Sequence, residues 1–364
     1  MYMGKAPATG HSHISPRINC NSPQNSLLPD FHDYYVVSVI DGKTGGTIMN
    51  ESAVRTPEAV QAEIKKTRHK GELPIYAISI ILGVIAVVIA GIYIFQDSGL
   101  LDSLKGVLQE NNITEASPEF NQVLLAVISF VSFIGGIGCF LYFVIANLIG
   151  YYQLYSDELS YSCRVSETNF PELYAYVKEF TRLLGLKKEP EVYIQSTGVI
   201  NACACWVPGK YYVRVNAEVL DLAYMENKDI DTVAFIMAHE FGHIYFHHPH
   251  ILYRIWTSFI GFVPVFGPSF MVPLYSRAKE YSADRVAQAL MDGKNKEECM
   301  MLLSTGRHLY KYTNVEDYLK VINKDHNFIE RFARFVVNMT ASHPITPFRT
   351  AAMMDEAKKS GRLL

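Results

Sequence analysis

Two histidines and a glutamate at one point in the sequence have the types and the spacing of a helical metal site. They are His239, Glu240 and His243, within the segment AHEFGHI at 238–244. On an α-helix, residues four apart lie on one face, so both imidazoles can bind one metal ion with the carboxylate beside them. Catalytic zinc keeps one position for water, and a neighbouring carboxylate can take a proton from that water and return it to the leaving group. The spacing therefore predicts zinc hydrolysis chemistry, with Glu240 as general base and then acid.

A hydrolytic zinc site needs a third protein ligand, and three further histidines follow the motif closely. They are His247, His248 and His250. In the metzincin pattern a glycine turns the chain after the second histidine so that a third can reach back, but Phe246 and Pro249 occupy those two positions here. We expect the three histidines to line the rim of the site or to continue the helix surface. A second metal ion at these histidines is the less favoured alternative.

A carboxylate on a second helix is the other source of a third ligand. The segment 277–291 is predicted to be a helix that ends before Gly293, and it contains Glu280 and Asp284 one turn apart. We predict that Glu280 is the third ligand. Asp284 would point the same way and hold the second nitrogen of a histidine ligand, which fixes the tautomer of that ring. Without the upstream motif, the two carboxylates would be interpreted as part of a solvated face.

The composition is more apolar than that of an ordinary soluble enzyme. Hydrophobic residues make up 49% of the chain and charged residues only 19%, which is an apolar balance. The net charge of −3 gives no basic excess, so we do not expect nucleic acid as a partner. Six cysteines are scattered through the chain and do not resemble a disulfide framework, which favours a reducing compartment.

Two uncharged apolar segments are long enough to cross a bilayer as helices. They are 74–95 and 123–149, and the second carries glycines that let helices approach closely in lipid. A basic cluster at 65–70 precedes the first segment, whereas the loop between the two segments is acidic. The positive-inside rule therefore predicts that the N-terminus lies in the cytoplasm. Two crossings return the chain to that side, so the zinc motif is also expected to face the cytoplasm.

The chain is predicted to have four parts. Residues 1–30 are polar and lack periodicity, which predicts a disordered tail. Residues 31–70 form a small cytoplasmic segment, with a hairpin at 34–49 and a helix that begins near Thr56. The membrane region and the zinc peptidase domain follow, at 71–150 and 151–364.

The peptidase domain is predicted to combine helices with a small β-sheet. A helix is expected from Pro171 to Gly185, and the motif helix is expected to begin at a cap, Asp229 or Asp231, and to be stopped by Pro249. Short strands are predicted at 191–195, 199–206 and 211–215, with a turn at 207–210. The predicted fold class is α+β, mainly α, with two N-terminal transmembrane helices and a zincin-type metalloprotease domain.

The motif HEFGH and the segment EYSAD at 280–284, after two apolar spans, resemble the HtpX-type membrane zinc proteases, which are related to the CAAX prenyl proteases. The resemblance covers roughly residues 70–355. Asn201, followed by Ala202, is similar to the family's Asn-Ala edge strand, whose asparagine holds the substrate backbone. His343, in a His-Pro pair, and Arg349 resemble late family residues that stabilise the tetrahedral intermediate and support the site. These roles are physically sensible, because edge strands bind extended peptides and donors near zinc bind oxyanions.

An apolar stretch at 251–275 lies between the motif and Glu280 and is interrupted by prolines. The resembled family usually carries a longer apolar insert here. Both metal ligands must meet at one ion, so the stretch cannot cross the membrane once, and two crossings need about 40 apolar residues. We predict a proline-broken re-entrant or interfacial hairpin that dips into the bilayer beside the site.

The predicted function is that of a zinc-dependent endopeptidase in the cell inner (plasma) membrane. It would bind one Zn²⁺ per chain, take protein substrates as extended strands, contact the lipid bilayer and act on membrane or misfolded proteins in quality control, as the resemblance implies. An oligomer is possible. Two alternatives stay open: a non-catalytic membrane zinc-binding scaffold or sensor, and a CAAX prenyl-peptide-type protease. Glu240 disfavours the scaffold, because a structural zinc site has no need of a carboxylate beside a water.

Overall fold

The structure is a computed structural model that describes residues 55–97, 99–111, 120–226, 228–260, 267–323 and 327–354, with Gly361 and Leu363. These residues all belong to one unit of the chain, Ser52–Leu364. The predicted tail at 1–30 and the predicted hairpin at 34–49 lie outside the described residues.

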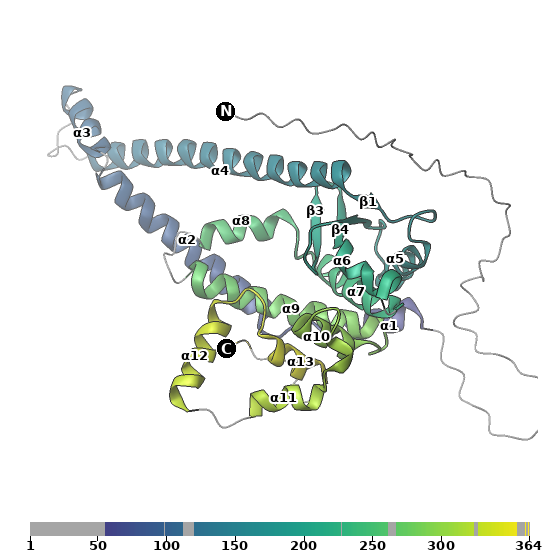
Figure 1. Cartoon of the computed structure of the whole chain (residues 1–364). Helices are drawn as coiled ribbons and strands as arrows, with labels where there is room; N and C mark the ends of the chain where they lie inside the picture. Colours follow the sequence, from purple (N-terminus) through teal and green to yellow (C-terminus); the bar gives the residue numbers. More distant parts are fainter. Residues whose placement is uncertain are drawn as a thin grey trace, which may run out of the picture. The chain divides into compact units, whose positions relative to one another are not determined.

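Helices make up most of this unit, as the predicted mainly α class requires (Figure 1). The α-helices are α1 (Pro57–Ile64), α2 (Glu72–Asp97), α3 (Leu100–Glu110), α4 (Phe120–Tyr161), α5 (Pro171–Leu184), α6 (Ala217–Asp221), α7 (Ile230–Tyr245), α8 (Ile251–Ile260), α9 (Val272–Leu290), α10 (Lys296–Thr305), α11 (Val315–Asn323), α12 (Phe328–Thr340) and α13 (Thr346–Met354). Shorter helical turns are η1 (Leu222–Glu226), η2 (Gly267–Met271) and η3 (Tyr310–Tyr312).

A four-stranded mixed sheet accompanies the helices. Its strands are β1 (Cys163–Arg164), β2 (Glu191–Gln195), β3 (Ala202–Val207) and β4 (Lys210–Asn216), in the spatial order β1-β2-β4-β3. Strands β3 and β4 form an antiparallel hairpin, and Gly209 in its turn has φ 91°, a conformation that glycine adopts without steric cost. β3 begins three residues later than predicted. It is one of the two edge strands of the described sheet, and its Ala204 contacts Glu240 of the motif.

One core joins the sheet to the helices that carry the metal motif. It includes Ile64 of α1, Phe180 of α5, Val213 of β4, Phe241 of α7 and Val286 of α9. Burying such side chains contributes about 1.5 to 3 kcal/mol each. The helix α1 therefore packs into the same core as α7 and α9, a contact that its polar sequence does not predict.

The helix α2 is long and apolar enough to cross a membrane, over Glu72–Tyr93. Ile75 and Ser79, one turn apart, are buried, whereas Ile85 and Ile89 are exposed. The buried stripe faces α8 and α9, which contact α2. Among the described residues no second helix meets the same criteria, so the predicted span at 123–149, which lies within α4, stays a prediction.

The helix α4 does not end where the predicted membrane region ends, but continues to Tyr161 and packs its last turns on the sheet. The hydroxyl of Tyr155 donates to Glu191 Oε2 at 2.7 Å. Arg214 of β4 forms an ion pair with Glu158 at 3.2 Å. The helix is therefore attached to the sheet at its C-terminal end.

Two helices, α8 and α9, include the first and the last residues of the apolar stretch at 251–275. α8 occupies its first part and packs against α2, with Trp256 and Ile260 buried. α9 begins at Val272, five residues before the predicted start at 277. Residues 261–266 lie outside the described residues, and entry of this hairpin into a bilayer stays a prediction.

Candidate metal centre

The motif helix α7 begins at a side-chain cap and ends earlier than predicted. Asp229 is the cap, because its Oδ1 accepts a hydrogen bond from the Thr232 backbone N–H at 3.1 Å. The helix ends at Tyr245, and His247 adopts a left-handed conformation with φ 60°. The prediction that Pro249 stops the helix is therefore wrong, because the chain has already turned at His247.

A glycine lets the two metal helices approach each other closely. A Cβ added to Gly242 of α7 would lie 3.0 Å from the Cα and the carbonyl oxygen of Ala283 in α9. Ala283 lies between Glu280 and Asp284, so this close approach brings the two carboxylates of α9 to the histidines of α7.

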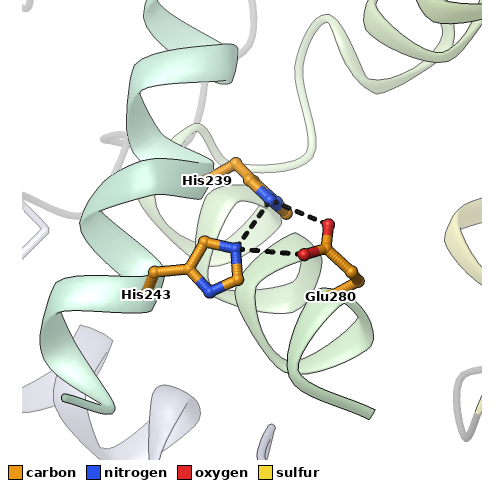
Figure 2. A group of neighbouring side chains, drawn as sticks. All are labelled: His239, His243 and Glu280. Atoms are coloured by element: carbon orange, nitrogen blue, oxygen red, sulfur yellow. Dashed lines mark hydrogen bonds and ion pairs between the residues drawn. The ribbon is translucent and has the colours of Figure 1, made fainter. Parts of the chain in front are cut away.

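The two histidines of the motif and Glu280 converge on one point (Figure 2). The Nε2 atoms of His239 and His243 are 3.1 Å apart. Each Nε2 lies 3.4 Å from an oxygen of Glu280. Ligand atoms about 2.0 to 2.1 Å from a tetrahedral zinc ion are about 3.3 Å apart, so the observed triangle has the size that such an ion requires.

The chemistry of the donors also fits a cation. The Nδ1 of His239 lies 2.8 Å from Asp284 Oδ1, so that nitrogen carries the ring proton and donates it to the carboxylate. The Nε2 of the same ring is then unprotonated, and its lone pair points toward Glu280 and His243. Three unprotonated donors facing one point repel each other unless a cation lies between them. The residues present therefore fit a zinc ion.

Buried charges around the donors hold the carboxylates ionised. Burial alone would raise the pKa of Glu280, but the neighbouring His239 and His243 hold that pKa well below its usual range. Burial also opposes ionisation of Asp284, and Arg349 lowers its pKa. Arg349 Nε donates to Asp284 Oδ2 at 2.6 Å, and its Nη1 lies 3.5 Å from Glu280. Burial and Arg349 disfavour a charge on His239, yet the two carboxylates raise the pKa of that ring to about 9. Without a metal ion, a second proton on His239 would therefore supply the positive charge that the two carboxylates favour.

Glu240 lies beside the ligands and is held by the edge strand. Its Oε2 accepts a hydrogen bond from the Ala204 backbone N–H at 2.6 Å. A cleft of about 950 Å³ runs along this side of the strand, and Asn201, Glu240 and His243 line it. The contact with Ala204 was not predicted, because a backbone N–H has no signature in the sequence.

The sequence model of peptidase family M48 matches residues 167–357, which include α7, α9 and α13. This chain belongs to peptidase family M48. It is therefore a metallopeptidase, in agreement with the resemblance to HtpX-type proteases. No curated protein and no solved structure matches the chain.

The late residues of this M48 peptidase lie in the same cleft. His343 precedes α13, its side chain is 65% exposed, and its Nε2 lies 3.6 Å from Glu280 Oε1. Arg349 of α13 contacts both carboxylates of α9. Asn201 directly precedes β3, and its carbonyl accepts from the Asn216 backbone N–H at 2.9 Å. The structure thus brings Asn201, His343 and Arg349 to one cleft, and their roles stay predictions.

One histidine after the motif, His248, lines the cleft and contacts the second histidine of the motif. His248 is buried, and its Nδ1 lies 2.7 Å from Nδ1 of His243. Burial lowers the pKa of His248 to about 3, so the ring is neutral at neutral pH. His247 contacts the hydroxyl of Tyr211 at 2.8 Å, and the His250 ring packs on Trp206. The sequence could not distinguish these three histidines, because the helix ends before them and the helical period no longer applies.

Proposed function

We propose that this M48 peptidase is a zinc-dependent endopeptidase that is anchored in a membrane and cuts extended segments of membrane or misfolded proteins. The observation that carries the proposal is the position of Glu240. Its carboxylate lies beside His239, His243 and Glu280, whose spacing fits a zinc ion. It is also held by a hydrogen bond from β3, the strand that lines the cleft. A non-catalytic zinc scaffold would have no use for such a carboxylate.

The proposed chemistry assigns one task to each oxygen of Glu240. A zinc ion held by His239, His243 and Glu280 would supply Lewis acidity, which makes a water molecule nucleophilic near neutral pH. Oε2 of Glu240 is occupied by the Ala204 N–H, so Oε1 takes the proton of the attacking water and passes it to the leaving amine.

His343 is the proposed donor to the oxyanion that forms during attack. The hydroxyl of Ser342 lies 3.0 Å from His343 Nδ1, and donation by that hydroxyl leaves the ring proton on Nε2. That Nε2 faces the cleft near Glu280, where a donor stabilises developing negative charge. The ring is exposed, so a substrate can reach it.

The proposed substrate is an extended segment of polypeptide. β3 lies at the edge of the described sheet, and its residues from Ala202 to Trp206 line the cleft. An extended peptide can add to such an edge by main-chain hydrogen bonds, which select conformation more than sequence. This mode of binding suits segments that are already unfolded.

Membrane anchoring is supported by the exposed apolar surface of α2. Of its side chains, Ile85, Val88 and Ile89 are each about half exposed or more, a surface that water disfavours and lipid accepts. The basic cluster at 65–70 precedes this helix, which favours a cytoplasmic site by the positive-inside rule.

Cleavage of casein by the purified full-length chain in detergent tests the proposal. We expect Glu240→Gln to lower the rate at least 100-fold while zinc content is retained, because proton transfer contributes about 10² to 10⁴ in rate. Glu167→Gln, which changes an exposed carboxylate, is the matched control and should leave the rate unchanged. Equal rates for wild type and Glu240→Gln would remove the endopeptidase proposal. Zinc binding with no cleavage by wild type would point to the scaffold alternative.

The substrate class needs a separate experiment. The Glu240→Gln form should retain bound substrates, because it keeps the zinc ligands and loses turnover. Cross-linking in native membranes should then recover unfolded or membrane proteins without a shared lipid group. Recovery restricted to prenylated chains would instead favour the CAAX prenyl-peptide alternative.

A further inference from the structure

A line of buried polar side chains leads from His243 to the first turn of α2. Figure 2 shows the second ring nitrogen of His243 on the side away from His239 and Glu280. That nitrogen, Nδ1, lies 2.7 Å from Nδ1 of His248. The Nε2 of His248 lies 3.2 Å from Oε1 of Glu72. His248 is 5% exposed and Glu72 is 1% exposed, so water does not compete for these contacts.

Glu72 is the first residue of α2, yet its carboxylate lies against α9. Ser282, which lies between Glu280 and Asp284 in α9, donates its hydroxyl to Glu72 Oε2 at 2.5 Å. Arg68 Nε lies 3.2 Å from Oε1 and supplies a positive charge. A buried carboxylate is costly unless it is paired and hydrogen-bonded, and here it is both.

The two histidine contacts define one arrangement of protons. His243 directs Nε2 to the metal point, so a neutral ring carries its proton on Nδ1. The contact with His248 then requires an unprotonated Nδ1 on His248. The proton of the neutral His248 ring is left on Nε2, where it is donated to Glu72. Each of the two contacts is thus a hydrogen bond, from His243 Nδ1–H to His248 and from His248 Nε2–H to Glu72.

We propose that Glu72 is a positioning residue of the metal centre, which acts through His248 to fix the tautomer and orientation of His243. The same kind of support reaches His239 directly from Asp284, so each histidine ligand has a carboxylate behind it. The difference is that the carboxylate behind His243 comes from the helix that is the candidate membrane span. The zinc site is therefore completed by the first turn of α2, about 170 residues before the motif in the sequence.

The proposal rests on the proposed zinc site, and its test measures zinc affinity instead of cleavage. Carboxylates behind metal-binding histidines are worth about 10- to 100-fold in metal affinity. We expect Glu72→Gln, measured on the full chain by competition with a chromophoric chelator, to weaken zinc binding at least tenfold. Glu63→Gln, which changes an exposed glutamate of α1, is the matched control and should bind zinc as wild type does.

A double-mutant cycle distinguishes action through His248 from a general loss of stability. In His248→Asn the amide oxygen can accept from His243 Nδ1, but the shorter side chain does not reach Glu72. We expect His248→Asn alone to weaken zinc binding several-fold or more, and the double variant to bind zinc no more weakly than the weaker single variant, because both changes break one line. If the loss of zinc affinity in the double variant equals the product of the losses in the two single variants, the two residues act independently and the proposal is overturned.

The remaining outcomes are also decisive. Zinc affinity of Glu72→Gln within twofold of wild type would overturn the proposal. A merely structural role would lower the melting temperature of the metal-free and the zinc-loaded protein equally, whereas a positioning role reduces the rise in melting temperature that zinc produces. If Glu72→Gln does not fold, unchanged affinity in His248→Asn overturns the proposal. Wild type that binds no zinc would instead refute the proposed function.

Discussion

Each histidine of the metal centre depends on the residue that holds its second nitrogen. For His239 that residue is Asp284, which also forms a bidentate pair with Arg349. A carboxylate in this position makes the imidazole a stronger donor and prevents its rotation. The strength of the metal site is therefore set by residues that would not themselves touch the metal.

Replacement of Asp284 tests this dependence. We expect Asp284→Asn to weaken zinc binding by about 10- to 100-fold, because the amide lacks the charge that polarises His239. It should also lower the melting temperature, since the buried Arg349 loses its main partner. Asp317→Asn, at an exposed position, is the control for the chemical change. Zinc affinity equal to wild type would show that Asp284 only pairs with Arg349.

At the scale of elements, the site depends on how closely α7 and α9 pack. Gly242 lies between the two ligands of α7, at the point where α9 is nearest. The helical period places His239 and His243 on one face of α7, but Glu280 reaches them only because no side chain separates the helices here.

An added methyl group should therefore separate the helices. Gly242→Ala gains about 0.5 to 1 kcal/mol in helix propensity but incurs about 1 to 3 kcal/mol of overpacking, so we expect a net loss of stability and weaker zinc binding. The same change at Gly106 of α3, where an added Cβ meets nothing within 4 Å, should be neutral or stabilising. Thermal unfolding measures the stability of both variants. Equal changes in melting temperature for Gly242→Ala and Gly106→Ala would contradict the close packing of α7 on α9.

The attachment of α4 to the sheet predicts a pH dependence. Glu191 accepts hydrogen bonds from Tyr155 and Lys210, and although burial opposes ionisation, these partners lower the pKa of Glu191 below 4.5. A carboxylate with a lowered pKa stabilises the fold above its unfolded pKa, and this contribution is lost as the pH falls through the folded value.

We expect Glu191→Gln to lower the free energy of unfolding by about 1 to 2 kcal/mol at pH 7. Below about pH 4 the difference from wild type should shrink, since the wild-type carboxyl is then becoming protonated. Denaturant unfolding at the two pH values measures this. A difference that is constant with pH would show that the charge of Glu191 does not attach α4 to the sheet.

At the scale of the whole molecule, periodic patterns were predictable and long-range contacts were not. Helical spacing placed His239, His243 and Glu280 on facing helices, and it placed Asp284 one turn beyond Glu280. The contact between His248 and Glu72 joins residues 176 positions apart in the sequence, and no local pattern reports it. The packing of α1 into the core was missed for the same reason, because its polar sequence conceals two buried residues, Val60 and Ile64.

The predicted hairpin at 251–275, between the motif and Glu280, implies a topology that can be measured. His250→Cys and Ser276→Cys place labels at the two ends of the apolar stretch. In sealed vesicles, an impermeant maleimide should label both positions from the cytoplasmic side, because His243 and Glu280 meet at one point. Labelling from opposite sides would contradict the arrangement of α7, α8 and α9.

The central claim is that His239, His243 and Glu280 together hold one catalytic zinc ion. The most direct measurement is casein cleavage by the full-length chain after chelation and dialysis, followed by stepwise return of zinc. The account predicts that cleavage falls to background without metal and returns fully at about one equivalent of zinc per chain. It also predicts no return in Glu280→Ala. Cleavage that persists in the metal-free protein, or that returns equally in Glu280→Ala, would contradict the account.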